Sequence, residues 1–486
     1  MSFYIYDVIF LVAFSLAVAI FLYKRRKKVQ REGILYLYRT QIGVKFINYI
    51  GGKYKKTLKV LAVISVICGY LLMIGMIYLL VKIVSVYLFQ PEIVRAIKIP
   101  PLLPLFPYLP EAFNVTFLPP FYFTYWIIAI AVVAIFHEFA HGIYMKLYGV
   151  KIKSTGFGFL GPFLAAFVEQ DEEDMEKKSR YRQIVILSAG VFSNFILALV
   201  FLLVLSGFFV LAYVPAGAMF NTYASSPVFV NTITGVGGIT IDGFTNQNIL
   251  YIINQNNLTN NLIFGSNGYT LNLIKITANG ETYYLSVENL KLQLEAEKEY
   301  VLLYNDLPAI NVAMKGSIIG VDDYKISDQG DLVEVLEDLN PGDEIKIITK
   351  YEDDILEYEI ILGEDPNQEG RAMIGIGYDS RTKLLSQVTD MFNFFKKPGT
   401  NYEPRFNADI ILFIYHLIWW LALINLSVAL VNMWPVAIFD GGRMFMLTIW
   451  AITGSKKVGE IAFKVATYAI LISLLVLMFG WAFAFI

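Results

Sequence analysis

Two histidines and a glutamate stand together in an otherwise apolar stretch of the sequence. The stretch AVVAIFHEFAHGIY contains His137, Glu138 and His141. Residues i and i+4 lie on one face of an α-helix, so both imidazoles can bind one tetrahedral zinc ion. Zinc lowers the pKa of a bound water to about 7, and Glu138 can accept the proton that this water releases. The spacing therefore predicts a zinc centre with Glu138 as catalytic base, and the alternative is a histidine pair satisfied by neighbouring helices.

A catalytic zinc ion takes three protein ligands and leaves one position for water. His416 has the right residue type, but we expect it at the opposite end of its apolar segment from the depth of the pair. At 1.5 Å per helical residue this mismatch is about 20 Å or more. Asp440 follows the same segment at the correct end, where Pro435 and two glycines break the helix. We therefore expect Asp440 to be the third ligand, the alternative being an ordinary Asp-Gly turn.

The composition places much of the chain in a membrane. Hydrophobic residues make up 56% of its 486 residues, charged residues only 16%, and the mean hydropathy is +0.56. A soluble domain is closer to 45–50% apolar and about 25% charged. The formal net charge of −2 argues against a nucleic-acid partner. The single cysteine, Cys68, excludes a disulfide framework and any multi-cysteine metal site.

Six apolar segments are long enough to span a bilayer, which takes about 20 residues of helix. They cover approximately residues 4–23, 59–89, 121–148, 184–214, 408–435 and 458–486. The loop 24–59 carries twelve Lys or Arg residues against one acid, and the loop 149–183 contributes six more Lys or Arg residues. Because cytoplasmic loops are rich in Lys and Arg, we expect both loops inside and the N-terminus outside. Residues 33–52 are predicted either to lie along the cytoplasmic interface or to form a soluble loop.

About 190 residues between the fourth and fifth segments have a different composition. They are rich in Asn, Asp, Gly and Glu, and short alternating apolar runs such as YTLNLIKI and EIKIITK are typical of strands. We expect a soluble β-rich region on the outer face.

The segments that contain the candidate metal ligands also resemble the motifs of a known protein family. HEFAH within one span and NMWPVAIFDGG in a later one resemble the site-2 protease family of intramembrane zinc metalloproteases, whose motifs are HExxH and N-x-x-P-x-x-x-L-D-G. The positions that match are His137, Glu138, His141, Asn432, Pro435, Asp440 and Gly441, with Phe439 in place of the usual Leu. The resemblance implies one Zn²⁺ held by His137, His141 and Asp440, with Glu138 as base. It also implies that Asn432 helps to hold the substrate backbone or the oxyanion, with Pro435 in the same substrate-binding segment.

Three further segments fit the same family. Gly156-Phe157-Gly158 resembles its membrane-associated β-hairpin, which can receive an unwound substrate as an added strand. SAGVFSN, ending at Asn194, resembles its AGP-x-x-N segment, to which we assign a role in helix packing. Residues 307–350 resemble a PDZ domain, and residues 225–250 resemble a weaker copy. We expect tandem PDZ-like modules, the competing organisation being one PDZ domain with a long insertion.

The predicted architecture is a polytopic α-helical membrane protein with a β-hairpin and an inserted PDZ-like region. The predicted divisions begin with a first helix and basic segment (1–58) and a second helix with its outer loop (59–120). The first half of the catalytic core (121–214) follows, then a degenerate PDZ-like module (215–300), a second PDZ-like module (301–385) and the second half of the core (386–486).

The resemblance implies an intramembrane zinc metalloendopeptidase in the cell membrane. It would cleave transmembrane segments of proteins already shortened outside, near the cytoplasmic face, with the PDZ-like region outside and open to a peptide ligand. One rival is a zinc peptidase of the prenyl-protein-processing type, which would use Glu or His as third ligand. The other rival is a non-catalytic membrane receptor or chaperone that uses the PDZ-like region.

Overall fold

The chain folds into two compact units, which we describe separately. The computed structural model describes residues 3–483 apart from 34, 91–93, 95–99, 102, 114, 116, 162, 242–244, 266, 367 and 379–390. Residues 1–209 and 409–486 form the first unit, and residues 210–408 form the second.

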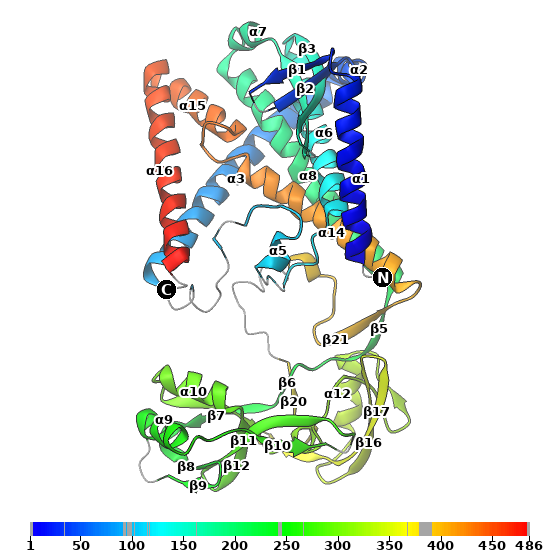
Figure 1. Ribbon diagram of the computed structural model, residues 1–486, viewed down its shortest axis with the longest axis vertical. Helices are drawn as coiled ribbons and strands as arrows, with labels where there is room; N and C mark the ends of the chain where they lie inside the picture. The colour runs from blue at the N-terminus through cyan, green and yellow to red at the C-terminus, as the bar shows by residue number, and fades with distance from the viewer. Residues whose placement is uncertain are drawn as a thin grey trace. The chain divides into compact units, whose positions relative to one another are not determined.

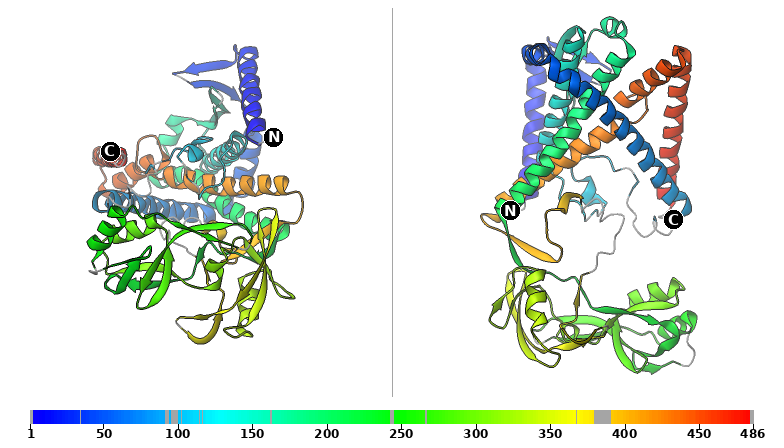
Figure 2. Two further views of the ribbon diagram at one scale, coloured as in Figure 1. Left: turned by 60° about the horizontal axis from the view of Figure 1, so that its bottom comes forward. Right: turned by 180° about the vertical axis from the view of Figure 1, so that it is seen from behind.

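The first unit is a bundle of long apolar helices (Figure 1). Within the described residues, six helices are long and apolar enough to cross a membrane, which confirms the six predicted segments with ends shifted by a few residues. They are α1 (Phe3–Lys24), α3 (Lys55–Phe89), α6 (Phe123–Tyr148), α8 (Arg180–Ala212), α14 (Ala408–Val431) and α16 (Lys456–Phe483). The shorter helices are α2 (Val44–Lys53), α5 (Leu109–Ala112), α7 (Glu172–Glu176) and α15 (Asp440–Thr453). α15 packs against α16 (Figure 1 and the right view of Figure 2).

A four-stranded antiparallel sheet stands beside α6. Its order is β1-β2-β3-β4, with strands β1 (Val29–Glu32), β2 (Leu35–Thr40), β3 (Ile152–Leu160) and β4 (Phe163–Gln170). β3 and β4 form the hairpin expected around Gly156–Gly158. The N-terminal hairpin β1–β2 extends it, because β2 pairs with β3 from Tyr36↔Phe159 to Thr40↔Thr155. The described part of residues 33–52 contains the strand β2 and the helix α2, so the segment is not an ordinary loop, and its place along the membrane interface stays a prediction.

A buried carboxylate on α1 fixes the start of α6. Asp7, 1% exposed, accepts hydrogen bonds from the backbone N–H groups of Phe123 at 2.7 Å and Thr124 at 2.8 Å. It also accepts from the Thr124 hydroxyl at 2.5 Å and from the hydroxyl of Tyr108. The first N–H groups of a helix have no partner within the helix, and a negative charge there is favourable. The first membrane-length helix thus caps the helix that carries the histidine pair.

The second unit contains two β-rich cores. One core is built within residues 228–303, and its strands pair in the order β7-β13-β12-β11-β8-β9, with β10 joined to β11. Its elements are β7 (Ser225–Phe229), η1 (Val230–Thr232), β8 (Ile233–Val236), β9 (Ile239–Thr240), α9 (Asn246–Gln255), β10 (Asn261–Phe264), β11 (Thr270–Ala278), β12 (Glu281–Leu285), α10 (Val287–Glu295) and β13 (Tyr300–Asn305).

The other core combines Ala218 with residues 309–374, so the chain leaves it after β6 and returns at α11. Its main sheet has the order β17-β16-β14-β5-β21, with β15 joined to β14, and β6 pairs with β20 and β18 with β19. Its elements are β5 (Tyr213–Ala218), β6 (Thr222–Tyr223), α11 (Pro308–Asn311), β14 (Ser317–Val321), β15 (Tyr324–Lys325), α12 (Gln329–Glu337), β16 (Glu344–Tyr351), β17 (Asp354–Ile361), β18 (Gly363–Asp365), β19 (Gln368–Met373), β20 (Ile376–Gly377) and β21 (Thr400–Pro404).

Candidate metal centre

Three side chains from two separate helices converge on one point in the first unit. The Nε2 atoms of His137 and His141, both on α6, are 3.0 Å apart. Asp440 Oδ2, at the first residue of α15, lies 3.2 Å from His137 Nε2 and 3.3 Å from His141 Nε2. Within the described part of the chain, these three residues form a group whose donor atoms could hold a metal ion.

The hydrogen bond made by His141 Nδ1 shows that His141 Nε2 presents its lone pair to His137 and Asp440. His141 Nδ1 lies 2.6 Å from the backbone carbonyl oxygen of Ile186 on α8. A carbonyl oxygen only accepts, so Nδ1 carries the proton and Nε2 is free to bind a metal. This pairing with a backbone carbonyl is the usual support for a zinc-bound histidine.

His137 is also supported from α8, by a buried amide. Asn194 Nδ2 lies 3.0 Å from His137 Nδ1, while Asn194 Oδ1 is buried without a hydrogen-bond partner. Metal binding through His137 Nε2 requires a proton on Nδ1. Rotating the Asn194 amide by half a turn lets its Oδ1 accept a hydrogen bond from this N–H. The rotation also gives the unpaired Oδ1 a partner. The donor set therefore fits a zinc ion.

One face of α8 runs along the metal-binding face of α6. Ile186, Gly190 and Asn194 are spaced by four residues, so they share this face. A Cβ atom on Gly190 would lie 2.4 Å from His141 Nε2 and 2.8 Å from His137 Nε2. Only glycine leaves room for the two imidazoles at this position. From the sequence we expect this segment only to pack helices, an expectation that misses its contacts with the histidines. The signal available was a polar Asn four residues after Gly within an apolar span.

Glu138 is oriented by the sheet. Its Oε2 atom accepts a hydrogen bond of 2.9 Å from the backbone N–H of Val168 on β4. β4 therefore reaches the carboxylate next to the histidine pair.

The break between α14 and α15 places Asp440. Gly441 N–H donates to the Asn432 carbonyl oxygen at 2.7 Å, which folds the segment back on itself. A Cβ on Gly441 would lie 2.4 Å from the backbone of Met433, and one on Gly442 would lie 2.2 Å from the carbonyl oxygen of Val436. The two glycines thus permit the close backbone approach that brings the carboxylate to the histidines.

A cavity of about 970 Å³ opens beside the three side chains. Asn432 lines it, together with Leu164, Ala165 and other residues of β4. The segment Gly156–Gly158 lies in β3, between β2 and β4, and Pro435 is buried; neither this segment nor Pro435 is among the residues that line the cavity. His416 lies on α14, with its ring 6.3 Å from that of Tyr125.

A charged network lies at the rim of the cavity. Arg39 on β2 donates to Glu169 Oε2 on β4 at 3.0 Å, and it also bonds Glu32 at 2.8 Å. A hydrogen bond from the Ser154 hydroxyl, together with the charge of Arg39, holds the pKa of Glu169 below its ordinary value. Glu169 is therefore an anion that links β4 to β2 through Arg39 and to β3 through Ser154.

The site and the sequence comparisons agree on a family. Two histidines and a carboxylate beside a glutamate form the kind of site that zinc hydrolases use. Residues 125–477 match Peptidase family M50, and the protein belongs to this family, that of the site-2 proteases. An uncharacterized protein of Methanocaldococcus jannaschii, MJ0971, is 32% identical over 196 residues, or 38% of this chain. The match spans about half of that relative, 47% of its length.

Proposed function

We propose that the protein is a zinc metalloendopeptidase that cleaves membrane-spanning segments of other proteins. The observation that carries the proposal is the convergence of His137, His141 and Asp440 within 3.3 Å of one another, on and beside helices of membrane-spanning length. The family match to Peptidase family M50 supports the same activity. Asp440 rather than Glu or His at the third position favours this activity over a prenyl-protein-processing peptidase.

The three side chains would hold one zinc ion through His137 Nε2, His141 Nε2 and a carboxylate oxygen of Asp440. Bound there, zinc would supply an activated water and a Lewis acid. Glu138 accepts the proton of the attacking water and passes it to the leaving amine. Ile186 and Asn194 hold the ring nitrogens that face away from the metal, which fixes the direction of both imidazoles.

The outer edge of β4 supports binding of an extended substrate. β3 occupies one edge of β4, and the N–H of Val168 points from the other edge to Glu138. Because strand residues alternate, Ala166 and Leu164 present their backbone groups to that same edge. A substrate helix that has unwound would add there as a strand, beside Glu138. Asn432, across the cavity, would hold its backbone or the oxyanion.

We also propose the orientation and role that the loop charges imply. The basic segment 24–59 would be cytoplasmic, with the N-terminus and the second unit outside and the metal centre near the cytoplasmic side. The substrate would be a transmembrane protein shortened beforehand outside the membrane, and cleavage would release its cytoplasmic part.

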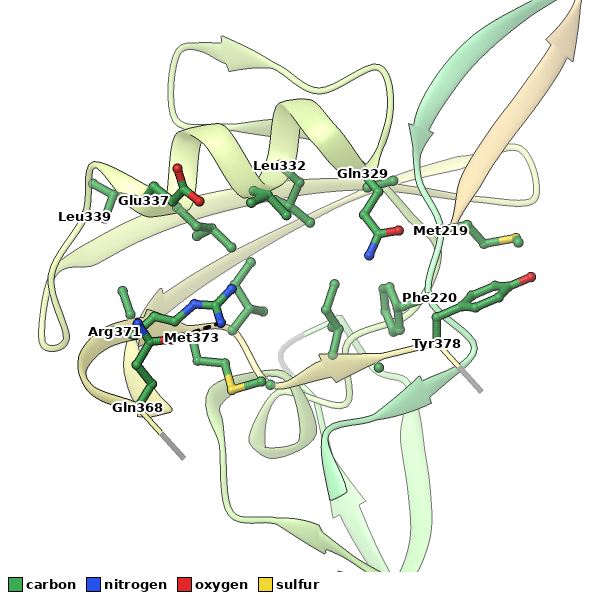
Figure 3. Close-up of a pocket in the computed structure, with 18 of the residues that line it drawn as sticks. Met219, Phe220, Gln329, Leu332, Glu337, Leu339, Gln368, Arg371, Met373 and Tyr378 are labelled. Carbon is green, nitrogen blue, oxygen red and sulfur yellow. Dashed lines mark hydrogen bonds between the residues drawn. The ribbon is translucent and has the colours of Figure 1, made fainter. Parts of the chain in front are cut away.

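The second unit would be a PDZ-like region with an inserted β domain. Of the two organisations considered for 215–385, the interrupted single module is supported by the core that joins Ala218 to residues 309–374 around the separate core of 228–303. A groove of about 650 Å³ lies beside α12 (Figure 3). Leu332 and Gln329 point into it from α12, and Met373 and Arg371 face them. The groove combines apolar side chains with the polar Gln329, the acidic Glu337 and the basic Arg371, a mixed lining that suits a peptide ligand.

The variant Glu138→Gln tests the proposed activity. It should keep one zinc per chain and lose cleavage of a single-span model substrate by at least about 100-fold, the range of a lost general base. Undiminished cleavage by Glu138→Gln would remove Glu138 as the base. Absence of cleavage by the zinc-loaded wild type over a panel of single-span substrates would favour the receptor role instead.

A further inference from the structure

The short helix α2 lies in the chain between two helices of membrane-spanning length. α1 ends at Lys24 and α3 begins at Lys55, and both are long and apolar enough to span the bilayer. Consecutive spans leave the residues between them at one face of the membrane. Tyr54 alone separates α2 from α3, so α2 lies at the level where the hydrocarbon meets the headgroups.

The outward face of α2 has the composition of an interfacial helix. Lys45, Phe46, Tyr49 and Lys53 follow a spacing of three or four residues along α2, which places them on one side, and the exposed Ile42 comes just before the helix. Phe46 and Tyr49 are 54% and 52% exposed, and both lysines are exposed. Aromatic rings and lysines side by side are typical of helices that lie in the bilayer interface.

One lysine of this face, Lys53, has aromatic neighbours. Lys53 Nζ donates to the Tyr49 hydroxyl at 2.6 Å and lies 5.0 Å and 5.5 Å from the ring centres of Tyr49 and Tyr54. Among the residues that the structure describes, no carboxylate pairs with Lys45 or Lys53 within 4.0 Å. With twelve basic residues against one acid in 24–59, the charge of this surface is complementary to an anionic headgroup.

The inward face of α2 packs on the metal-binding helix. Ile47 is fully buried, and a Cβ on Gly142 of α6 would lie 3.0 Å from it. A Cβ on Gly51 would lie 2.7 Å from the carbonyl oxygen of Ile143. These contacts adjoin His141, so what holds α2 in place also supports the helix of the metal centre.

We propose that α2 is a binding surface for anionic lipid headgroups, which hold it against α6. Lys45 and Lys53 contact the headgroups, while Ile42, Phe46 and Tyr49 enter the outer part of the hydrocarbon. The proposal requires that the chain spans a membrane, and it is independent of hydrolysis and of zinc.

Hydrogen exchange of the full-length protein in lipid nanodiscs tests this binding. Amides 44–53 are compared in phosphatidylcholine alone and in phosphatidylcholine containing phosphatidylglycerol, at low and high salt. Each lysine near an anionic surface contributes about fivefold, so two should slow exchange by roughly 10- to 30-fold at low salt. High salt should remove most of this difference, because it screens the charges.

Paired variants identify the residues responsible. Lys45→Gln with Lys53→Gln should abolish most of the lipid effect, whereas Lys298→Gln with Lys325→Gln, two exposed lysines of the second unit, should retain it. Equal exchange of wild-type α2 in both lipids would overturn the proposal without any variant. A full lipid effect in the Lys45→Gln, Lys53→Gln protein would also overturn it.

Discussion

A single methyl group added at Gly190 should damage the metal centre. In Gly190→Ala, the new Cβ would lie 2.4 Å from His141 Nε2 and 2.7 Å from His137 Cε1. An ordinary contact needs 3.4 Å or more, so at least one imidazole has to move by about 1 Å. Metal–ligand distances tolerate only about ±0.2 Å. Since changes to groups that merely support a ligand cost about 10- to 100-fold in metal affinity, we expect this variant to lose at least about 100-fold.

The assay is zinc binding in competition with a chelator, measured on purified protein in detergent. Gly207→Ala is the matched control, because Gly207 is on the same helix and a Cβ there would meet nothing within 4 Å. Alanine in a helix interior is favoured over glycine by up to about 1 kcal/mol, so the control should fold at least as well as the wild type. Wild-type zinc affinity in Gly190→Ala would refute the packing of α8 against both imidazoles.

Three further changes address the other parts of the site. Asp440→Ala should reduce zinc occupancy strongly, by metal analysis, and unchanged occupancy would assign the third ligand elsewhere. Asn194→Leu should weaken zinc binding about 10- to 100-fold, while Asn194→Asp, which can still accept from His137 Nδ1, should restore much of it; equal affinity in both would contradict the positioning role. Because the pKa of Glu169 is lowered from its ordinary 4.5, its charge stabilises the sheet at every pH above 4.5. This stabilisation is lost as the pH falls through the lowered pKa. Protection of the β3–β4 amides, corrected for their intrinsic exchange rates, should therefore fall at low pH in the wild type more than in Glu169→Gln.

The three side chains of the candidate metal centre could be predicted from the sequence because their chemistry is local and rare. Ionisable side chains are costly within an apolar span, so an i, i+4 histidine pair there points to a shared metal ion. Helix rise argued against His416 as the third ligand, and the helix break at the other end of the same segment pointed to Asp440. The six spans followed from their length and composition, and the structure confirms them within a few residues.

Other features depend on pairings between distant residues, which a single sequence does not encode. The pairing of β2 with β3 joins segments more than 110 residues apart, and no local pattern in LYLYRT predicts that partner. The contact of Asn194 with His137 depends on how α8 is rotated against α6. The sequence divides the second unit near residue 300, but only the pattern of burial shows that Ala218 belongs with the later core.

The most direct test of the metal centre is X-ray absorption at the zinc edge of the purified protein. We predict one zinc with two imidazole nitrogens at about 2.0–2.1 Å and oxygen ligands at about 2.0–2.2 Å. Asp440→Ala should change the oxygen shell and leave both imidazoles. A third imidazole in the wild-type spectrum, or a folded protein that binds no zinc, would contradict the assignment of His137, His141 and Asp440 as the ligands.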